Sequence, residues 1–165
     1  MMLCAGVAFT SCEKEEIGGT ATESMAGDWY VTIGLVDEDG EVVPGYEDLL
    51  GGRVHLLTYN TAANTSTQLY VDDLGEIWYP AGFKVRTTSN IHAMTFATDG
   101  TAVNENDEDC EVTITSGKIL PKAGRQNNGS PADSIVFYVS FSDDDDPTTV
   151  YKVSGIRYSG LEEND

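Results

Sequence analysis

The sequence predicts an all-β protein built from one domain, a single eight-stranded antiparallel up-and-down barrel. From Asp28 onward, no window of the 165-residue chain shows the sustained 3.6-residue apolar period of an amphipathic helix. Short runs that alternate apolar and polar residues, rich in β-branched and aromatic types, recur along the chain instead. The stretches between them contain Gly, Asn, Asp and Ser, which favour tight turns.

Eight runs have the length and alternation of strands, and we expect them at residues 28–36, 53–60, 65–71, 83–88, 91–97, 110–115, 134–142 and 149–158. Eight antiparallel strands in sequence can close into a barrel without exposed edges. A two-sheet sandwich is the main alternative.

The apolar residues of these runs fall on single faces, so they predict the barrel interior. We expect the inward positions to line a cavity for a small apolar ligand, although a barrel of this size can equally be filled by its own side chains. The expected lining residues are Val31, Ile33, Leu56, Leu69, Ala93, Phe137 and Val139.

The N-terminus resembles a bacterial lipoprotein signal. The apolar run 3–9 is followed by Thr10, Ser11 and Cys12, so we expect a signal peptide at residues 1–11, truncated at its start, and acylation of Cys12. Seven apolar residues are too few to span a bilayer. Residues 12–26 then form a flexible tether to a barrel domain at residues 27–165.

The acidic stretch 13–16 resembles the surface-export tag of Bacteroidetes lipoproteins, with a polar tether as the alternative. Together these features predict an outer-membrane lipoprotein displayed on the cell surface, and they leave the periplasmic face open. The sequence does not fix the oligomeric state.

Charge excludes one class of partner. The chain has 28 Asp and Glu against 9 Lys and Arg, a net charge of −19, whereas nucleic-acid binding depends on basic residues that neutralise phosphates. Because loops alternate between the two ends of an up-and-down barrel, 18 of the 28 acidic residues are expected at one rim, the mouth. Such a rim disfavours anionic ligands.

The mouth is also expected to hold an aromatic cluster of Trp78, Tyr79 and Phe83. These side chains suit a gate for an apolar ligand or a stacking platform for a glycan, and a lid packed on the barrel's own core is the alternative. A glycan or a protein partner could bind at this acidic rim.

Catalytic, metal and cofactor motifs are not found. The sequence has no Gly-x-Ser-x-Gly elbow, and His55 and His92 lie in expected strands without an adjacent nucleophile. The acidic runs lack the spacing of a Ca²⁺-binding loop, and Cys110 is expected to be a half-buried structural residue. We therefore expect no catalytic residue, no metal site and no cofactor.

Gly27-Asp28-Trp29 at the start of the first strand resembles the Gly-x-Trp motif of lipocalins, with Arg157 near the end of the last strand. In lipocalins the Trp closes the barrel floor and an Arg packs across its ring, a cation–π contact. The resemblance therefore implies structural roles for Gly27, Trp29 and Arg157.

The second half of the chain is similar to the Bacteroidetes lipoprotein family called lipid-binding putative hydrolase, which resembles calycin barrels. The segments that carry this similarity are 116–120, 132–135, 141–144 and 151–157. The family implies lipid binding and hydrolysis, but it supplies no catalytic residues that can be placed here. Three functions remain open: a carrier of a small apolar ligand, a surface protein that binds a glycan or protein, and a hydrolase.

Overall fold

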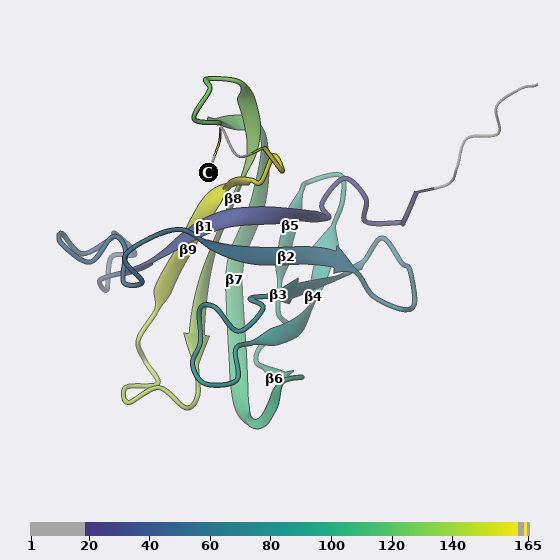
Figure 1. Ribbon diagram of the computed structural model, residues 1–165. Helices are drawn as coiled ribbons and strands as arrows, with labels where there is room; N and C mark the ends of the chain where they lie inside the picture. Colours follow the sequence, from purple (N-terminus) through teal and green to yellow (C-terminus); the bar gives the residue numbers. More distant parts are fainter. Residues whose placement is uncertain (1–18, 162–163, 165) are drawn as a thin grey trace, which may run out of the picture.

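The computed structural model describes residues 19–161 and 164, and it confirms the all-β barrel (Figure 1). Its nine strands are β1 (Gly27–Leu35), β2 (Val54–Asn60), β3 (Gln68–Asp72), β4 (Lys84–Asn90), β5 (Thr95–Ala97), β6 (Ala102–Asn104), β7 (Asp107–Arg125), β8 (Pro131–Phe141) and β9 (Tyr151–Arg157). The expected signal peptide, Cys12 and residues 13–18 lie outside the described residues.

The strands pair in the order β5-β4-β3-β2-β1-β9-β8-β7-β6, and a further pairing of β5 with β7 closes the ring. Eight strands therefore form the barrel, and β6 pairs with the start of β7 outside it. This closure excludes the sandwich. The closing seam is short, because β5 meets β7 through only two residue pairs, Thr95 with Lys118 and Phe96 with Gly117.

Strand β7 is far longer than the expected run 110–115, with 19 residues. Its alternation is interrupted at Ser116 and Lys122, which both have positive φ angles, and its register with β8 shifts at these two places. Such bulges bend a strand without ending it. They let β7 pair with β6 and β5 on one side and with β8 on the other.

Two other boundaries differ from expectation. Strand β4 continues through Asn90, so the expected turn at Ser89 and Asn90 lies within a strand, and the chain turns at residues 91–94 instead. The carboxamide of Asn90 organises this turn by accepting hydrogen bonds from the backbone of His92 and Ala93. His92 is therefore an exposed turn residue, not part of the barrel wall.

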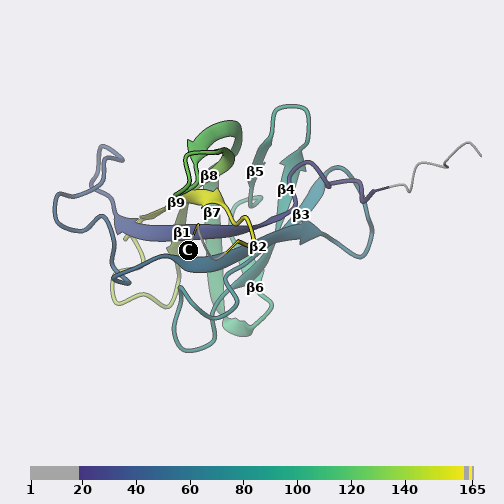
Figure 2. The ribbon, with the colours of Figure 1, turned by 45° about the horizontal axis from the view of Figure 1, so that its top comes forward.

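The loops alternate between the two barrel ends, as expected for an up-and-down order (Figures 1 and 2). We call one end the acidic end; it carries the loops 36–53, 73–83 and 142–150 and the segment 98–106, which contains β6. We call the other the floor end; it carries residues 19–26 and the loops 61–67, 91–94 and 126–130.

Residues 20–26, expected to be part of a flexible tether, belong to the folded domain. They form turns in which the backbone of Met25 and Ala26 donates to the carbonyl of Thr22, and the side chain of Met25 is fully buried. The hydroxyl of Thr58 also donates to the Met25 carbonyl, at 2.7 Å. The turn thus covers the floor end because it supplies an apolar side chain to the core.

Candidate functional site

The barrel interior was the expected ligand site, and the structure fills it with side chains. Six of the seven expected lining residues are buried on the inner face: Val31, Ile33, Leu56, Leu69, Phe137 and Val139. Several of these side chains have no solvent-accessible surface. The ring centroids of Phe96 and Phe137 lie 5.7 Å apart. The interior of this structure is therefore a packed core rather than an open cavity.

The seventh residue, Ala93, does not line the interior. It lies in the exposed turn 91–94, because β5 begins at Thr95, four residues later than the expected strand. The inward position on this strand belongs instead to Phe96, which is 3% exposed.

The loop 73–83 closes the acidic end, and a buried carboxylate organises it. Asp73 accepts hydrogen bonds from the backbone of Gly75, Ile77, Trp78 and Phe83, at 2.7–3.0 Å. Four donors on one carboxylate hold the loop in a single conformation.

The three aromatic residues expected at the mouth all lie in this loop but differ in burial. Phe83 is fully buried. Trp78 is half-buried, stacks on Phe141 with ring centroids 3.8 Å apart, and donates from Nε1 to Asp143. Tyr79 points to solvent and is 88% exposed. Trp78 is thus part of a cap on the core, and Tyr79 is the exposed aromatic residue of this cap.

The floor end contains the Trp29–Arg157 contact that the lipocalin resemblance implies. The guanidinium carbon lies 4.4 Å from the Trp29 ring centroid, and Trp29 Nε1 donates to the hydroxyl of Thr58 at 2.8 Å. A Cβ at Gly27 would collide with the Arg157 guanidinium. Gly at this position therefore leaves the space that the arginine occupies.

Two groups are of types that enzymes use in acid–base or thiol catalysis: the His55–Asp28 pair and the Cys110 thiol. His55 Nδ1 lies 2.8 Å from Asp28 Oδ1, beside the rings of Tyr30 and Tyr158. No serine, threonine or cysteine side chain is recorded as a hydrogen-bond partner of this pair within residues 19–161 and 164. Burial and the hydrogen bond to Asp143 raise the pKa of the Cys110 thiol to about 12, so the thiol is protonated at neutral pH.

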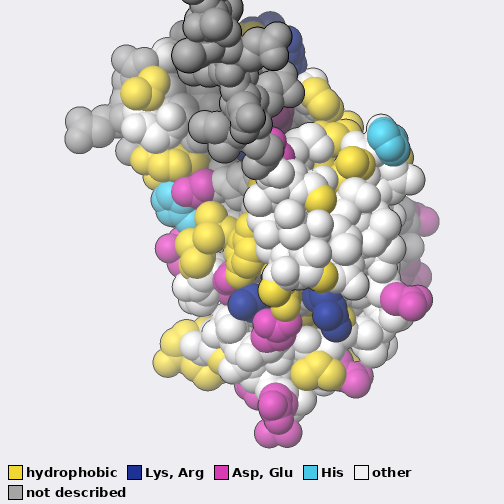
Figure 3. Space-filling model, turned by 90° about the vertical axis from the view of Figure 1, so that its right-hand side faces the viewer, with side chains coloured by type: hydrophobic (Ala, Val, Ile, Leu, Met, Phe, Trp, Pro, Cys, Tyr) yellow, Lys and Arg dark blue, Asp and Glu magenta, His cyan; other side chains and the backbone are white. Residues whose placement is uncertain are grey.

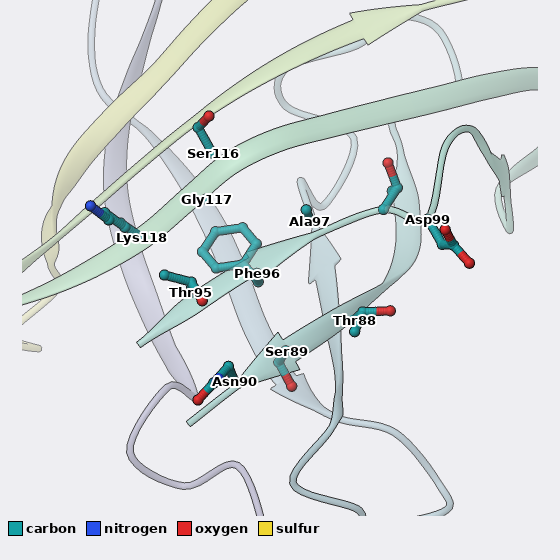
Figure 4. Close-up of a pocket in the computed structure, with 11 residues that line it drawn as sticks. Thr88, Ser89, Asn90, Thr95, Phe96, Ala97, Asp99, Ser116, Gly117 and Lys118 are labelled. Carbon is teal, nitrogen blue, oxygen red and sulfur yellow. The ribbon is translucent and has the colours of Figure 1, made fainter. Parts of the chain in front are cut away.

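Two neighbouring grooves on the outer wall combine polar side chains with a similar share of apolar surface. The larger has a volume of about 840 Å³ and lies across β4, β5 and β7, where Figure 4 shows Thr88, Asn90, Ser116 and Lys118 around the ring of Phe96. The second, of about 690 Å³, shares Thr88 and Asp99 with it and extends to β6. Figure 3 shows a mostly uncharged face on which a few basic side chains lie beside acidic ones.

A third groove, of about 520 Å³, lies on the outer wall formed by β1, β9, β8 and β7. We call it the wall groove. Its larger apolar residues are Leu120, Val136 and Ile156, and Arg53 and Lys152 supply two basic groups. Sequence reasoning missed these positions, because outward residues on strands carry no signal until the register brings them together.

Two further structural results bear on function. Within residues 19–161 and 164, no group of three or more His, Cys, Asp or Glu side chains is placed to hold a metal ion. No helix in the same part of the chain is long and apolar enough to cross a membrane.

The fold defines the class as a closed antiparallel β-barrel with a packed core and grooves on its outer wall. The family described as lipid-binding putative hydrolase matches residues 14–162. The chain therefore belongs to this family, as its sequence motifs indicated. A search of curated proteins finds no match.

Proposed function

We infer that this protein is a non-catalytic lipid-binding barrel that takes up a small apolar ligand without chemical change. Its family supports the ligand class, because the match covers nearly the whole chain. The observation that carries the proposal is the wall groove, which opens to solvent and presents apolar side chains from β7, β8 and β9. Its volume of about 520 Å³ falls within the range of ~300–1,000 Å³ usual for small-ligand sites.

The interior is the less favoured site for the same ligand. An acyl chain there would have to displace buried side chains such as Leu56 and Phe137, and the cap would have to lift Trp78 from Phe141. Interior packing of this kind resists insertion, because each added methylene strains the surrounding core.

The proposal is tested by stripping the full chain of lipid and titrating it with methyl palmitate, a neutral long-chain ester. We expect displacement of an apolar fluorescent dye and a one-to-one adduct in the native mass spectrum. Because Trp78 lies in the cap, its fluorescence also reports the site: it stays unchanged for a ligand in the wall groove and changes for one in the interior. No dye uptake and no adduct with any long-chain lipid would refute lipid binding.

The proposal includes a membrane anchor at Cys12, which places the protein on the outer membrane, with the cell surface as the expected face and the periplasmic face as the alternative. The chain enters the described domain at the floor end, which suits attachment there. Labelling with radioactive palmitate tests this: the wild type should incorporate it and Cys12→Ser should not. Protease added to intact cells then tests surface exposure.

A second candidate function rests on Tyr79. An aromatic ring that is 88% exposed, on a loop that also carries Glu76, suits stacking against a glycan or burial in a partner protein. If this end is the binding surface, Tyr79→Ala abolishes binding to a carbohydrate array or a captured partner, while the buried-cap variant Trp78→Phe retains it.

Hydrolysis is not part of the proposal. Within the described residues, the one histidine ring paired with a carboxylate is that of His55, with Asp28. A serine-type mechanism also needs a nucleophile in hydrogen-bond reach of the base.

A further inference from the structure

Strand register determines which outward residues lie side by side in the wall groove. Outward residues of β1, β9, β8 and β7 form two adjacent rows, because Tyr30 pairs with Ile156 and Thr32 pairs with Ser154. The row nearer the floor end contains Tyr30, Ile156, Ser134 and Leu120, and the row nearer the acidic end contains Thr32, Ser154, Val136 and, on β7, Lys118. Small residues in the centre of the second row leave the hollow, and larger apolar side chains border it.

Two basic side chains line this hollow: Arg53 lies beside Thr32 at the β2 side of the second row, and Lys152 lies next to that row toward the acidic end. Arg53 immediately precedes β2, and Lys152 precedes Ser154 on β9. Neither forms an ion pair with any acidic residue that the structure describes, whereas Lys84 pairs with Glu105 and Arg157 with Asp133. Both therefore remain free to bind an anion in a protein whose net charge is −19.

The acidic hairpin 36–42 reaches the same wall, since the hydroxyl of Tyr138 donates to the Gly40 carbonyl at 3.4 Å. Its carboxylate at Asp37 is used within the hairpin, where it accepts from the backbone of Asp39 and Glu41. The hairpin also carries Glu38, Asp39 and Glu41, and within the described residues none of its carboxylates forms an ion pair with Lys152.

We propose that the wall groove binds a long-chain fatty acid, whose carboxylate lies between Arg53 and Lys152 and whose acyl chain runs toward the floor end over Ile156 and Leu120. Arginine suits this role because its planar fork can donate two hydrogen bonds to one carboxylate. A single-chain amphiphile fits a groove of about 520 Å³ that is basic at one side and apolar at the other. This inference rests on the proposed lipid binding and deepens it.

The charge of the ligand distinguishes this site from the barrel mouth. A ligand that enters through the acidic end passes a rim of carboxylates, which repels a fatty acid relative to its neutral ester. A ligand in the wall groove meets Arg53 and Lys152, which reverses the preference. Comparing palmitate with methyl palmitate therefore reports where the ligand binds.

The experiment titrates the full chain, stripped of lipid, with palmitate and with methyl palmitate in the dye-displacement assay. We expect palmitate to bind about tenfold more tightly, and the preference to shrink as salt rises, because exposed charges are screened. The variant Arg53→Gln/Lys152→Gln should weaken palmitate about tenfold and change methyl palmitate less than twofold. The matched control Arg86→Gln, an exposed residue of β4 that lies outside the wall groove, should retain the preference.

A second variant tests the same site if the double substitution unfolds the chain. Ser154→Phe places a ring in the hollow and should block both ligands, while its circular dichroism remains that of the wild type. If palmitate and methyl palmitate bind equally and these substitutions change neither affinity, the fatty acid does not bind in the wall groove. That result would leave the proposed lipid binding itself uncontradicted. Failure of both ligands to bind the wild type would instead refute the proposed function itself.

Discussion

The guanidinium of Arg157 lies across the indole of Trp29 and also donates from Nη1 to the carbonyl of Ala26, at 2.6 Å. Its Nε makes a further bond to Asp133 at 3.2 Å. One side chain on the last strand therefore joins the first strand, the N-terminal turn and β8 at the floor end.

Replacing Arg157 by Ala should lower the free energy of unfolding by about 2–3 kcal/mol, because it removes a cation–π contact and hydrogen bonds to a charged donor. Arg157→Lys should recover only part of this loss, since an ammonium cannot make all three contacts. Urea unfolding, monitored by tryptophan fluorescence, measures the free energy of unfolding of both variants. Arg86→Lys, at an exposed position, is the control; a similar loss there would contradict a specific role for Arg157.

Replacing Asp73 by Asn should loosen the cap on the acidic end. The carboxamide offers one acceptor oxygen where the carboxylate serves four backbone donors, so we expect a loss of about 2–4 kcal/mol in the free energy of unfolding. Trp78 should also become more accessible to acrylamide, and this increase should vanish when Trp78 is replaced by Phe. Asp99→Asn, on an exposed loop, should leave quenching unchanged, and unaltered quenching in Asp73→Asn would show that another contact holds the cap.

Stability should fall at alkaline pH. Burial and Asp143 raise the pKa of Cys110 to about 12, so above pH ~9 the unfolded chain releases this proton while the folded chain retains it. The unfolded state then binds fewer protons, and the free energy of unfolding decreases by up to about 1.4 kcal/mol per pH unit from this site until the folded thiol titrates. Burial and the hydrogen bond to Asp144 raise the pKa of Tyr151 in the same direction.

Urea unfolding at several pH values between about 8 and 11 measures this decline. The range begins below the ordinary thiol pKa of about 8.5. Cys110→Ala should show a shallower decline than the wild type, although it is less stable at pH 8 because a buried side chain is shortened. Identical pH slopes for the two proteins would exclude Cys110 as a source of the loss.

Removing the N-terminal turn should destabilise the barrel. Met25 is fully buried at the floor end, and Met25→Ala should cost about 2–4 kcal/mol in the free energy of unfolding. A chain shortened to begin at Gly27 should lose at least as much, whereas Glu23→Ala, at an exposed position, should stay within about 0.5 kcal/mol. Thermal denaturation of the three variants decides whether the folded domain begins before Gly27.

The sequence was sufficient for the fold class, because strict alternation such as that of Trp29, Val31 and Ile33 marks one buried face regardless of which strands are neighbours. It was not sufficient for β7. Bulges at Ser116 and Lys122 shift the alternation, so one long strand looks like a short strand followed by a loop.

The site was less predictable than the fold, for a geometric reason. Alternation shows that Leu56 and Phe137 face inward, but whether opposing side chains meet or leave a space depends on barrel radius, which no local pattern contains. The wall groove depends on register in the same way. Arg53 and Lys152 are 99 positions apart in the chain, and only the order β2-β1-β9 brings them to one wall.

The alternation of loops has an electrical consequence. Carboxylates are gathered at the acidic end, while Lys122 and Arg125 lie at the floor end of β7, so the domain is an electric dipole aligned with the barrel axis. In the field of an anionic membrane, this dipole experiences a torque that turns the acidic end toward the bulk solution. Near any anionic surface, the orientation with the acidic end pointing away is therefore the lower in electrostatic energy, and raising the ionic strength weakens this preference.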